Sequence, residues 1–145
     1  MANVTRSIMA NGSVSDIYTL WAQFENFPNF MKHIRSVNYI RPNATHWVMQ
    51  GPLGKTIEWD AVTTVQEPNR RIAWQSTGGN VKHGGNVIFE QVTPDQVRIT
   101  ATIDFELPGG ELGEKLVQYF GDLDGRVQED LENFRNYAEA ILART

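Results

Sequence analysis

The segment 97–106 alternates strictly between apolar and polar residues over its whole length. Its apolar positions are Val97, Ile99, Ala101, Ile103 and Phe105, and its polar positions are Arg98, Thr100, Thr102, Asp104 and Glu106. Because successive side chains of a strand point to opposite faces, this pattern predicts a strand with one covered face and one wet face. Such strands are typical of antiparallel sheets, so the chain is expected to build one.

Shorter alternations of the same kind recur between residues 35 and 96. Ile57, Trp59 and Ala61, for example, alternate with Glu58 and Asp60. Turn-forming residues separate the runs at 41–43, 51–54, 67–69, 77–80 and 93–95. Together with the β-compatible segment 4–10, these runs predict seven strands.

Helical patterns lie on either side of this strand-rich region. Ser13 begins a first helix with a capping pattern, and Pro28 ends it, so a second short helix is expected over 29–34. After the Pro108-Gly109-Gly110 stop, apolar residues recur every three or four positions from Leu112 to Ile141. This spacing predicts an amphipathic helix of about 30 residues, long enough to cross a sheet.

Composition excludes several classes of protein. The 145 residues are expected to form one domain, residues 1–145. The net charge is −4, whereas a nucleic-acid-binding protein needs a basic face, so no nucleic-acid partner is predicted. The absence of cysteine excludes disulfides, thiolate metal sites and cysteine nucleophiles. No run approaches the ~20 apolar residues of a membrane span, and the first residues lack a secretory pattern, so a cytoplasmic protein is expected.

Chemical motifs are sparse. The histidines His33, His46 and His83 have no partner visible in the sequence, and no nucleophile elbow, phosphate loop or metal-ligand spacing is present. The strand carboxylates are out of phase with the apolar residues and are expected to face solvent; they are Glu58, Asp60, Asp104 and Glu106. We therefore predict no catalytic residue, metal ion or cofactor.

Several stretches, read together, resemble one family. They are Trp21 to Met31, Glu58 to Ala61, Arg70 to Trp74, Gly84 to Phe89, and Asp130 to Phe134. They are similar to the polyketide cyclase/dehydrase family of the START-like (SRPBCC, helix-grip) superfamily, and the likeness spans nearly the whole chain. One departure is Ser13, where that family usually has a proline, and it affects only helix capping. The resemblance implies an α+β fold in which a curved seven-stranded antiparallel sheet grips a long C-terminal helix, with two short helices after the first strand.

The layout places a ligand cleft between sheet and helix, and the resemblance implies its occupant. We expect a small hydrophobic molecule, such as a lipid, quinone, polyketide or other aromatic compound. The residues expected to line the cavity are Trp47, Met49, Trp59, Trp74, Phe89, Ile103 and Phe105 on the sheet and Leu116 and Phe120 on the helix. Trp59 and Trp74 are the first choices, whereas Trp21 is assigned to packing.

Two other functions remain open from the sequence. One is a cyclase, aromatase or dehydratase in the same cavity, which would need an inward polar pair such as His83 with Gln91 or Ser76. The other is an interaction module, which would need a large exposed apolar patch. No pattern in the sequence specifies an oligomeric state.

Overall fold

The computed structural model describes residues 2–79, 82–106, 110 and 123–144. Within these ranges the chain forms seven strands, two α-helices and two 3₁₀ helices. The strands are β1 (Ala2–Asn11), β2 (Ile34–Arg41), β3 (Ala44–Gln50), β4 (Thr56–Glu67), β5 (Arg71–Gly79), β6 (Lys82–Thr93) and β7 (Gln96–Glu106). The α-helices are α1 (Val14–Trp21) and α3 (Leu123–Leu142), and the 3₁₀ helices are η1 (Phe24–Asn29) and η2 (Pro52–Gly54).

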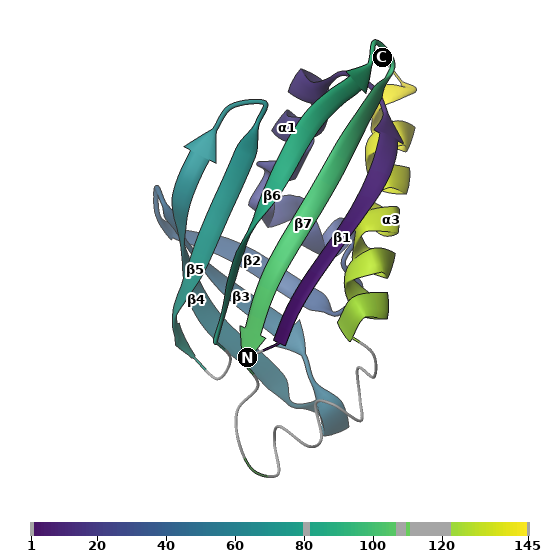
Figure 1. Ribbon diagram of the computed structural model, residues 1–145. Coiled ribbons are helices and arrows are strands. Elements are labelled where there is room, and N and C mark those ends of the chain that lie inside the picture. Colours follow the sequence, from purple (N-terminus) through teal and green to yellow (C-terminus); the bar gives the residue numbers. More distant parts are fainter. Residues whose placement is uncertain (1, 80–81, 107–109, 111–122, 145) are drawn as a thin grey trace.

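All seven strands belong to one antiparallel sheet with the order β1-β7-β6-β5-β4-β3-β2. Strands β2 to β7 therefore follow one another as a meander, and β1 joins the far edge by pairing with β7. The sheet is strongly curved, so that β2 and β3 pass behind β6 and β7, on the side where α1 and α3 lie (Figure 1). The seven-stranded antiparallel sheet predicted from the alternating pattern is confirmed.

The two short helices lie between β1 and β2 as expected, but their boundaries differ from the prediction. Ser13 caps α1, with its Oγ accepting a hydrogen bond from the backbone N–H of Asp16 at 3.2 Å. The second helix is a 3₁₀ helix over Phe24–Asn29, not a helix over 29–34, and it includes Pro28. Pro28, the fifth residue of η1, has no backbone N–H to donate, which a short 3₁₀ helix tolerates and a longer α-helix does not.

Aromatic side chains fill one end of the space between sheet and helices. Trp21 contacts Phe27, Phe89 and Phe134, with ring centroids 5.4, 6.1 and 4.7 Å away. Phe134 comes from α3 and is fully buried. Trp21 therefore joins α1, the sheet and α3, which agrees with its assignment to packing.

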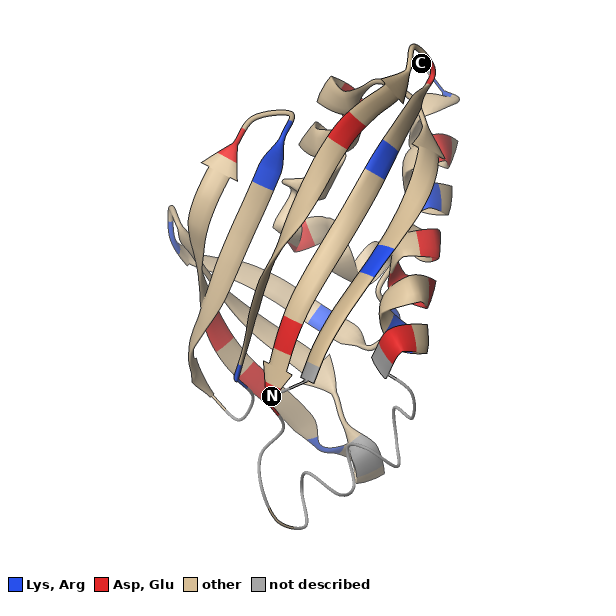
Figure 2. Ribbon diagram, viewed as in Figure 1, with Lys and Arg blue, Asp and Glu red and all other residues tan. Residues whose placement is uncertain are grey.

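The described part of the C-terminal helix lies along β1 (Figure 1). Its buried positions, Val127, Leu131, Phe134 and Ala138, recur at helical spacing. Charged residues of both signs are visible on the side of α3 turned away from the sheet (Figure 2). The predicted helix thus holds over Leu123–Leu142, and its earlier part, from Leu112, lies outside the described residues. In the described part of the chain, no helix is long and apolar enough to cross a membrane.

A glycine allows two strands to approach each other closely near the end of β5. The register of β4 against β5 shifts between Asp60 and Ala61, and Gly79 lies opposite Trp59. Gly79 has φ +111°, and a Cβ at this position would collide with the carbonyl of Glu58. Only glycine adopts this backbone conformation at low cost, so the residue helps to bring β5 against Trp59.

Candidate functional site

Five ring-bearing side chains from five successive strands lie together on the inner face of the sheet. They are Trp47 on β3, Trp59 on β4, Trp74 on β5, His83 on β6 and Phe105 on β7, and together they are called the aromatic wall below. Trp47 pairs with Trp59, and His83 pairs with Phe105, across neighbouring strands. Because directly paired residues share a face, the strand register itself brings these rings side by side.

The rings of the aromatic wall contact one another. Trp47 stacks on Trp59 with centroids 5.9 Å apart and an interplanar angle of 9°. His83 meets Trp59 edge to face at 5.0 Å, and it also contacts Trp74 and Phe105, each at 6.4 Å. His83 is therefore the hub that joins the rings of β4, β5 and β7.

Exposure differs between the two ends of the inner face. Trp47, Trp74, His83 and Phe105 are only half-buried, as are their apolar neighbours Met49 and Ile103. At the other end, the inward residues Ile72, Val87, Phe89 and Ile99 are each 3% exposed or less. Solvent therefore reaches apolar side chains on the inner face at the wall, while α1, η1 and α3 fill the opposite end.

Hydrogen bonds fix the orientation of three side chains in the wall. The indole Nε1–H of Trp47 donates to Thr45 Oγ1 at 2.8 Å, and that of Trp74 donates to His83 Nδ1 at 3.0 Å. The backbone N–H of His83 donates to Ser76 Oγ at 3.0 Å. The ring of His83 is therefore held by Trp74, whereas Gln91 makes its hydrogen bonds to Gly12, Val14, Thr93 and Gln96 at the other end of β6.

The environment of His83 keeps its ring uncharged. Burial lowers the pKa of His83 from 6.5 to about 4, because a partly desolvated ring cannot easily accept a second proton. At pH 7 the imidazole is neutral and Nδ1 already accepts the proton of Trp74. Such a ring is a weak base at neutral pH and serves more naturally as a hydrogen-bond donor.

Most of the sequence-predicted lining residues lie on or beside the aromatic wall. These are Trp47, Met49, Trp59, Trp74, Ile103 and Phe105. Phe89 instead lies in the filled end, 3% exposed and 5.3 Å from the ring of Tyr18. Leu116 and Phe120 lie outside the described residues.

His46 has partners that sequence reasoning missed. Its Nδ1 lies 2.6 Å from Asp60 Oδ1 and its Nε2 lies 2.9 Å from Glu58 Oε1, on the outer face of β3 and β4. The hydrogen bonds to Asp60 and then Glu58 raise the pKa of His46 above its usual value. The sequence did not reveal these partners because they depend on the strand register, which pairs His46 with Asp60. Among the described residues, no three His, Asp or Glu side chains are placed to hold a metal ion.

Asp130 is a second group that sequence reasoning did not single out. It lies on α3 three residues after Val127 and four before Phe134, both of which face the core. Burial raises the pKa of Asp130 from 3.8 to about 7, and the nearby charge of Arg126 only partly opposes this rise. The helical spacing was a signal that could have identified this inward carboxyl group.

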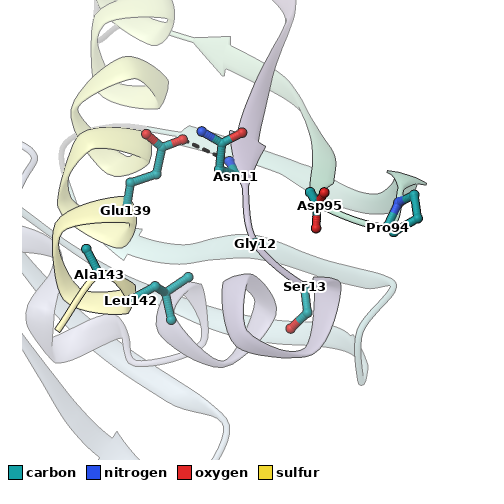
Figure 3. A pocket seen from close by; sticks show the side chains of 8 residues that line it. All are labelled: Asn11, Gly12, Ser13, Pro94, Asp95, Glu139, Leu142 and Ala143. Atoms are coloured by element: carbon teal, nitrogen blue, oxygen red, sulfur yellow. Dashed lines mark hydrogen bonds between the residues drawn. The ribbon is translucent and has the colours of Figure 1, made fainter. Parts of the chain in front are cut away.

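An open hollow of about 530 Å³ lies at the opposite end of the sheet from the aromatic wall (Figure 3). It is lined by Asn11, Gly12, Ser13, Pro94, Asp95, Glu139, Leu142 and Ala143. Glu139 accepts the backbone N–H of Asn11 at 2.8 Å, and Gly12 donates its backbone N–H to the carbonyl of Asp95 at 2.8 Å. These hydrogen bonds connect the β1–α1 turn to α3 and to the β6–β7 turn. The hollow is therefore the space left where these three parts of the chain meet.

Comparison with known proteins identifies the chain's relatives. The family model described as polyketide cyclase/dehydrase and lipid transport matches residues 11–132. An uncharacterized 17.2 kDa protein of Streptomyces lincolnensis is 32% identical over 139 residues, which cover 96% of this chain and 91% of that protein. Both matches extend over most of the chain.

Solved structures share the fold at lower identity. The Zhui aromatase/cyclase of a Streptomyces species superposes with a TM-score of 0.77 at 13% identity, covering 95% of this chain and 93% of that one. A START superfamily protein of Mycobacterium smegmatis gives a TM-score of 0.75 at 15% identity, covering 96% and 98%. The curved sheet with its C-terminal helix is therefore the START-like, helix-grip fold. The chain belongs to the polyketide cyclase/dehydrase and lipid transport family.

Proposed function

We propose that this protein binds a small hydrophobic molecule, such as a lipid, quinone or aromatic polyketide, between the aromatic wall and the C-terminal helix. The observation that carries the proposal is the half-exposure of inward apolar rings at one end of an otherwise filled interior. Removing such surface from water contributes roughly 25 cal/mol per Å², and this is the main driving force for apolar ligands.

The chemistry of the wall favours binding over reaction. Its one titratable ring, His83, is neutral at pH 7 because burial lowers its pKa to about 4. It pairs with Trp74 rather than with a carboxylate that would make it a stronger base. The family description, which includes lipid transport, agrees with a carrier.

The experiment is a melting-temperature screen with lipids, quinones and aromatic polyketides. A ligand at about 100 times its dissociation constant stabilises the folded state by roughly 2.7 kcal/mol, which raises the melting temperature of a chain this long by roughly 5 °C or more. Trp74→Ala is expected to abolish the shift. The matched control is Ile88→Ala. Ile88 is an exposed residue of β6, and it lies on the face of the sheet opposite to that of the wall rings. No shift with any compound, or an equal shift in both variants, would contradict the proposal.

A second candidate function is that of a cyclase or dehydratase. The observation that favours it is Asp130, whose pKa of about 7 lets the carboxyl group exchange protons near neutral pH. The aromatase/cyclase among the structural relatives has the same fold. In this case Asp130→Asn would retain ligand binding but abolish product formation, whereas a carrier would show no turnover in either form.

A further inference from the structure

Two N–H groups of the aromatic wall have no hydrogen-bond partner in the part of the chain that the structure describes, and the first belongs to His83. Its Nδ1 accepts the indole proton of Trp74 at 3.0 Å. Because an indole nitrogen can only donate, Nδ1 carries no proton, and the proton of the neutral ring is on Nε2. Nε2 is buried and has no partner among the described residues. His83 therefore presents an unused donor.

The second unused donor is the indole N–H of Trp59. The side chain is 6% exposed, and its Nε1 is buried without a partner in the described part of the chain. Its ring centroid lies 5.0 Å from that of His83. The neighbouring indoles differ, since Trp47 donates to Thr45 and Trp74 donates to His83. The two unused donors thus lie on adjoining rings.

The chemistry of these donors restricts what can satisfy them. A buried donor without a partner has lost its hydrogen bond to water, so a ligand that supplies an acceptor recovers this free energy on binding. Both groups donate and neither carries charge at pH 7, so nothing here offsets the desolvation of a carboxylate. A hydroxyl would bring a proton of its own, and Nδ1 of His83, the acceptor of this pair of rings, is already occupied by Trp74. A carbonyl oxygen, with two lone pairs and no proton, fits best.

We infer that the hydrophobic ligand carries a ketone or quinone carbonyl whose oxygen accepts hydrogen bonds from Trp59 Nε1 and His83 Nε2. This inference rests on the proposed binding function and narrows its ligand class. A fatty acid or a plain hydrocarbon would leave both donors unpaired or bury an uncompensated charge. The wall therefore selects uncharged, carbonyl-bearing ring compounds.

The test uses two probes of one shape, 9-fluorenone and fluorene, which differ by a carbonyl oxygen. Fluorenone is expected to bind about tenfold more tightly than fluorene, since one net hydrogen bond corresponds to roughly that factor. Trp59→Phe keeps a ring but removes the N–H, and it is expected to reduce the preference severalfold. Trp47→Phe is the matched control, because the indole N–H of Trp47 is already bonded to Thr45, and it should retain the preference.

Nuclear magnetic resonance of the ¹⁵N-labelled wild-type protein makes the test independent of the variants' folding. The free protein at pH 7 should show the His83 proton on Nε2, and fluorenone but not fluorene should shift one indole N–H signal strongly. A proton on Nδ1, or equal affinity for the two probes, would overturn the inference while binding itself stands. Binding of neither probe would overturn the inference, and the proposed function is overturned with it when the melting-temperature screen also gives no shift with any compound.

Discussion

At the scale of single residues, His83 and Asp130 respond to burial with pKa shifts of opposite direction. Burial lowers the pKa of His83 to about 4 and raises that of Asp130 to about 7. The cause is shared, since desolvation disfavours the charged form of either group. Both groups are therefore mainly uncharged in mildly acidic solution, between the two values, and each links folding stability to pH in a different direction.

The His83 linkage can be measured with His83→Gln, which keeps an acceptor for Trp74 but does not titrate. A folded-state pKa below the unfolded 6.5 contributes stability above pH 6.5 that is lost as the pH falls toward 4. Between pH 7 and 4.5, wild type should therefore lose on the order of 1–2 kcal/mol more stability than the variant. Urea unfolding at the two pH values checks this.

His46→Gln is the opposite control for that experiment. The carboxylates of Asp60 and Glu58 raise the pKa of His46, so its contribution is present below pH 6.5 and is lost as the pH rises through the folded-state value. Its substitution should cost more stability at pH 5.5 than at pH 8. Parallel pH profiles for the two histidine variants would show that the assigned environments are wrong.

Asp130→Asn tests the inward carboxyl group. A folded-state pKa of about 7 against 3.8 unfolded means that stability is full below pH 3.8 and declines as the pH rises through 7. The variant should therefore be more stable than wild type at pH 8, by on the order of 1–2 kcal/mol, and nearly equal to it at pH 4. Thermal unfolding at both pH values measures this, with the exposed Glu132→Gln as control. A gain at pH 8 that Glu132→Gln matches would point to net charge instead.

Residue types and alternation predicted which side chains face inward, but not which polar atoms meet. Trp59 and Trp74 were identifiable because they share the phase of their apolar neighbours. The hydrogen bond from Trp74 to His83 joins the adjacent strands β5 and β6, so it depends on their register. Gly84 and Gly85 influence that register because they allow neighbouring strands to approach closely. The pairing of His46 with Asp60 depends on register in the same way. Alternation excludes slips of one residue between neighbouring strands, because they would turn the apolar side chains to the other face, but it does not distinguish offsets that differ by two residues.

At the scale of elements, strands were predicted better than the short helices. A period of two over many residues is a strong signal, whereas η1 is a six-residue 3₁₀ helix around Pro28 with no periodicity to detect. The amphipathic spacing correctly identified the C-terminal helix over Leu123–Leu142. The periodicity of apolar residues thus predicted the long strands and the C-terminal helix, which each bury one face. Tertiary packing determined η1, whose sequence has no such periodicity.

The end of β5 supplies an element-scale prediction. Gly79→Ala should destabilise the protein by about 1–3 kcal/mol, because the residue has φ +111° and a Cβ would meet the Glu58 carbonyl and Trp59. The adjacent Gly78→Ala is the matched control, since a Cβ there meets nothing within 4 Å. Chemical unfolding of both variants decides the point. Equal stability would mean that β5 does not need this conformation to approach β4.

At the scale of the whole molecule, the interior is divided between a filled end and a wall that solvent reaches. Phe134 is fully buried among Trp21 and Phe30, whereas Trp74 is half-buried. Phe134→Ala should therefore cost about 3–5 kcal/mol of stability, and Trp74→Ala should cost clearly less although tryptophan is larger. Urea unfolding without ligand compares the two. A greater loss for Trp74→Ala would mean that the wall, too, is part of the structural core.

The strand order also affects how the chain is made. The segment Ala2–Asn11 is synthesised before all the other strands of the sheet, yet its partner is β7, where Ala2 pairs with Phe105. Until Gln96–Glu106 has been synthesised, β1 has no neighbour in the sheet, and α3, which packs along it, is made later still. Val4 and Ile8 therefore remain without their native cover until β7 has been synthesised, and exposed apolar strands promote aggregation during that time. Closure of the sheet is consequently a late event, and nascent chains that end before β7 keep their first strand available to chaperones.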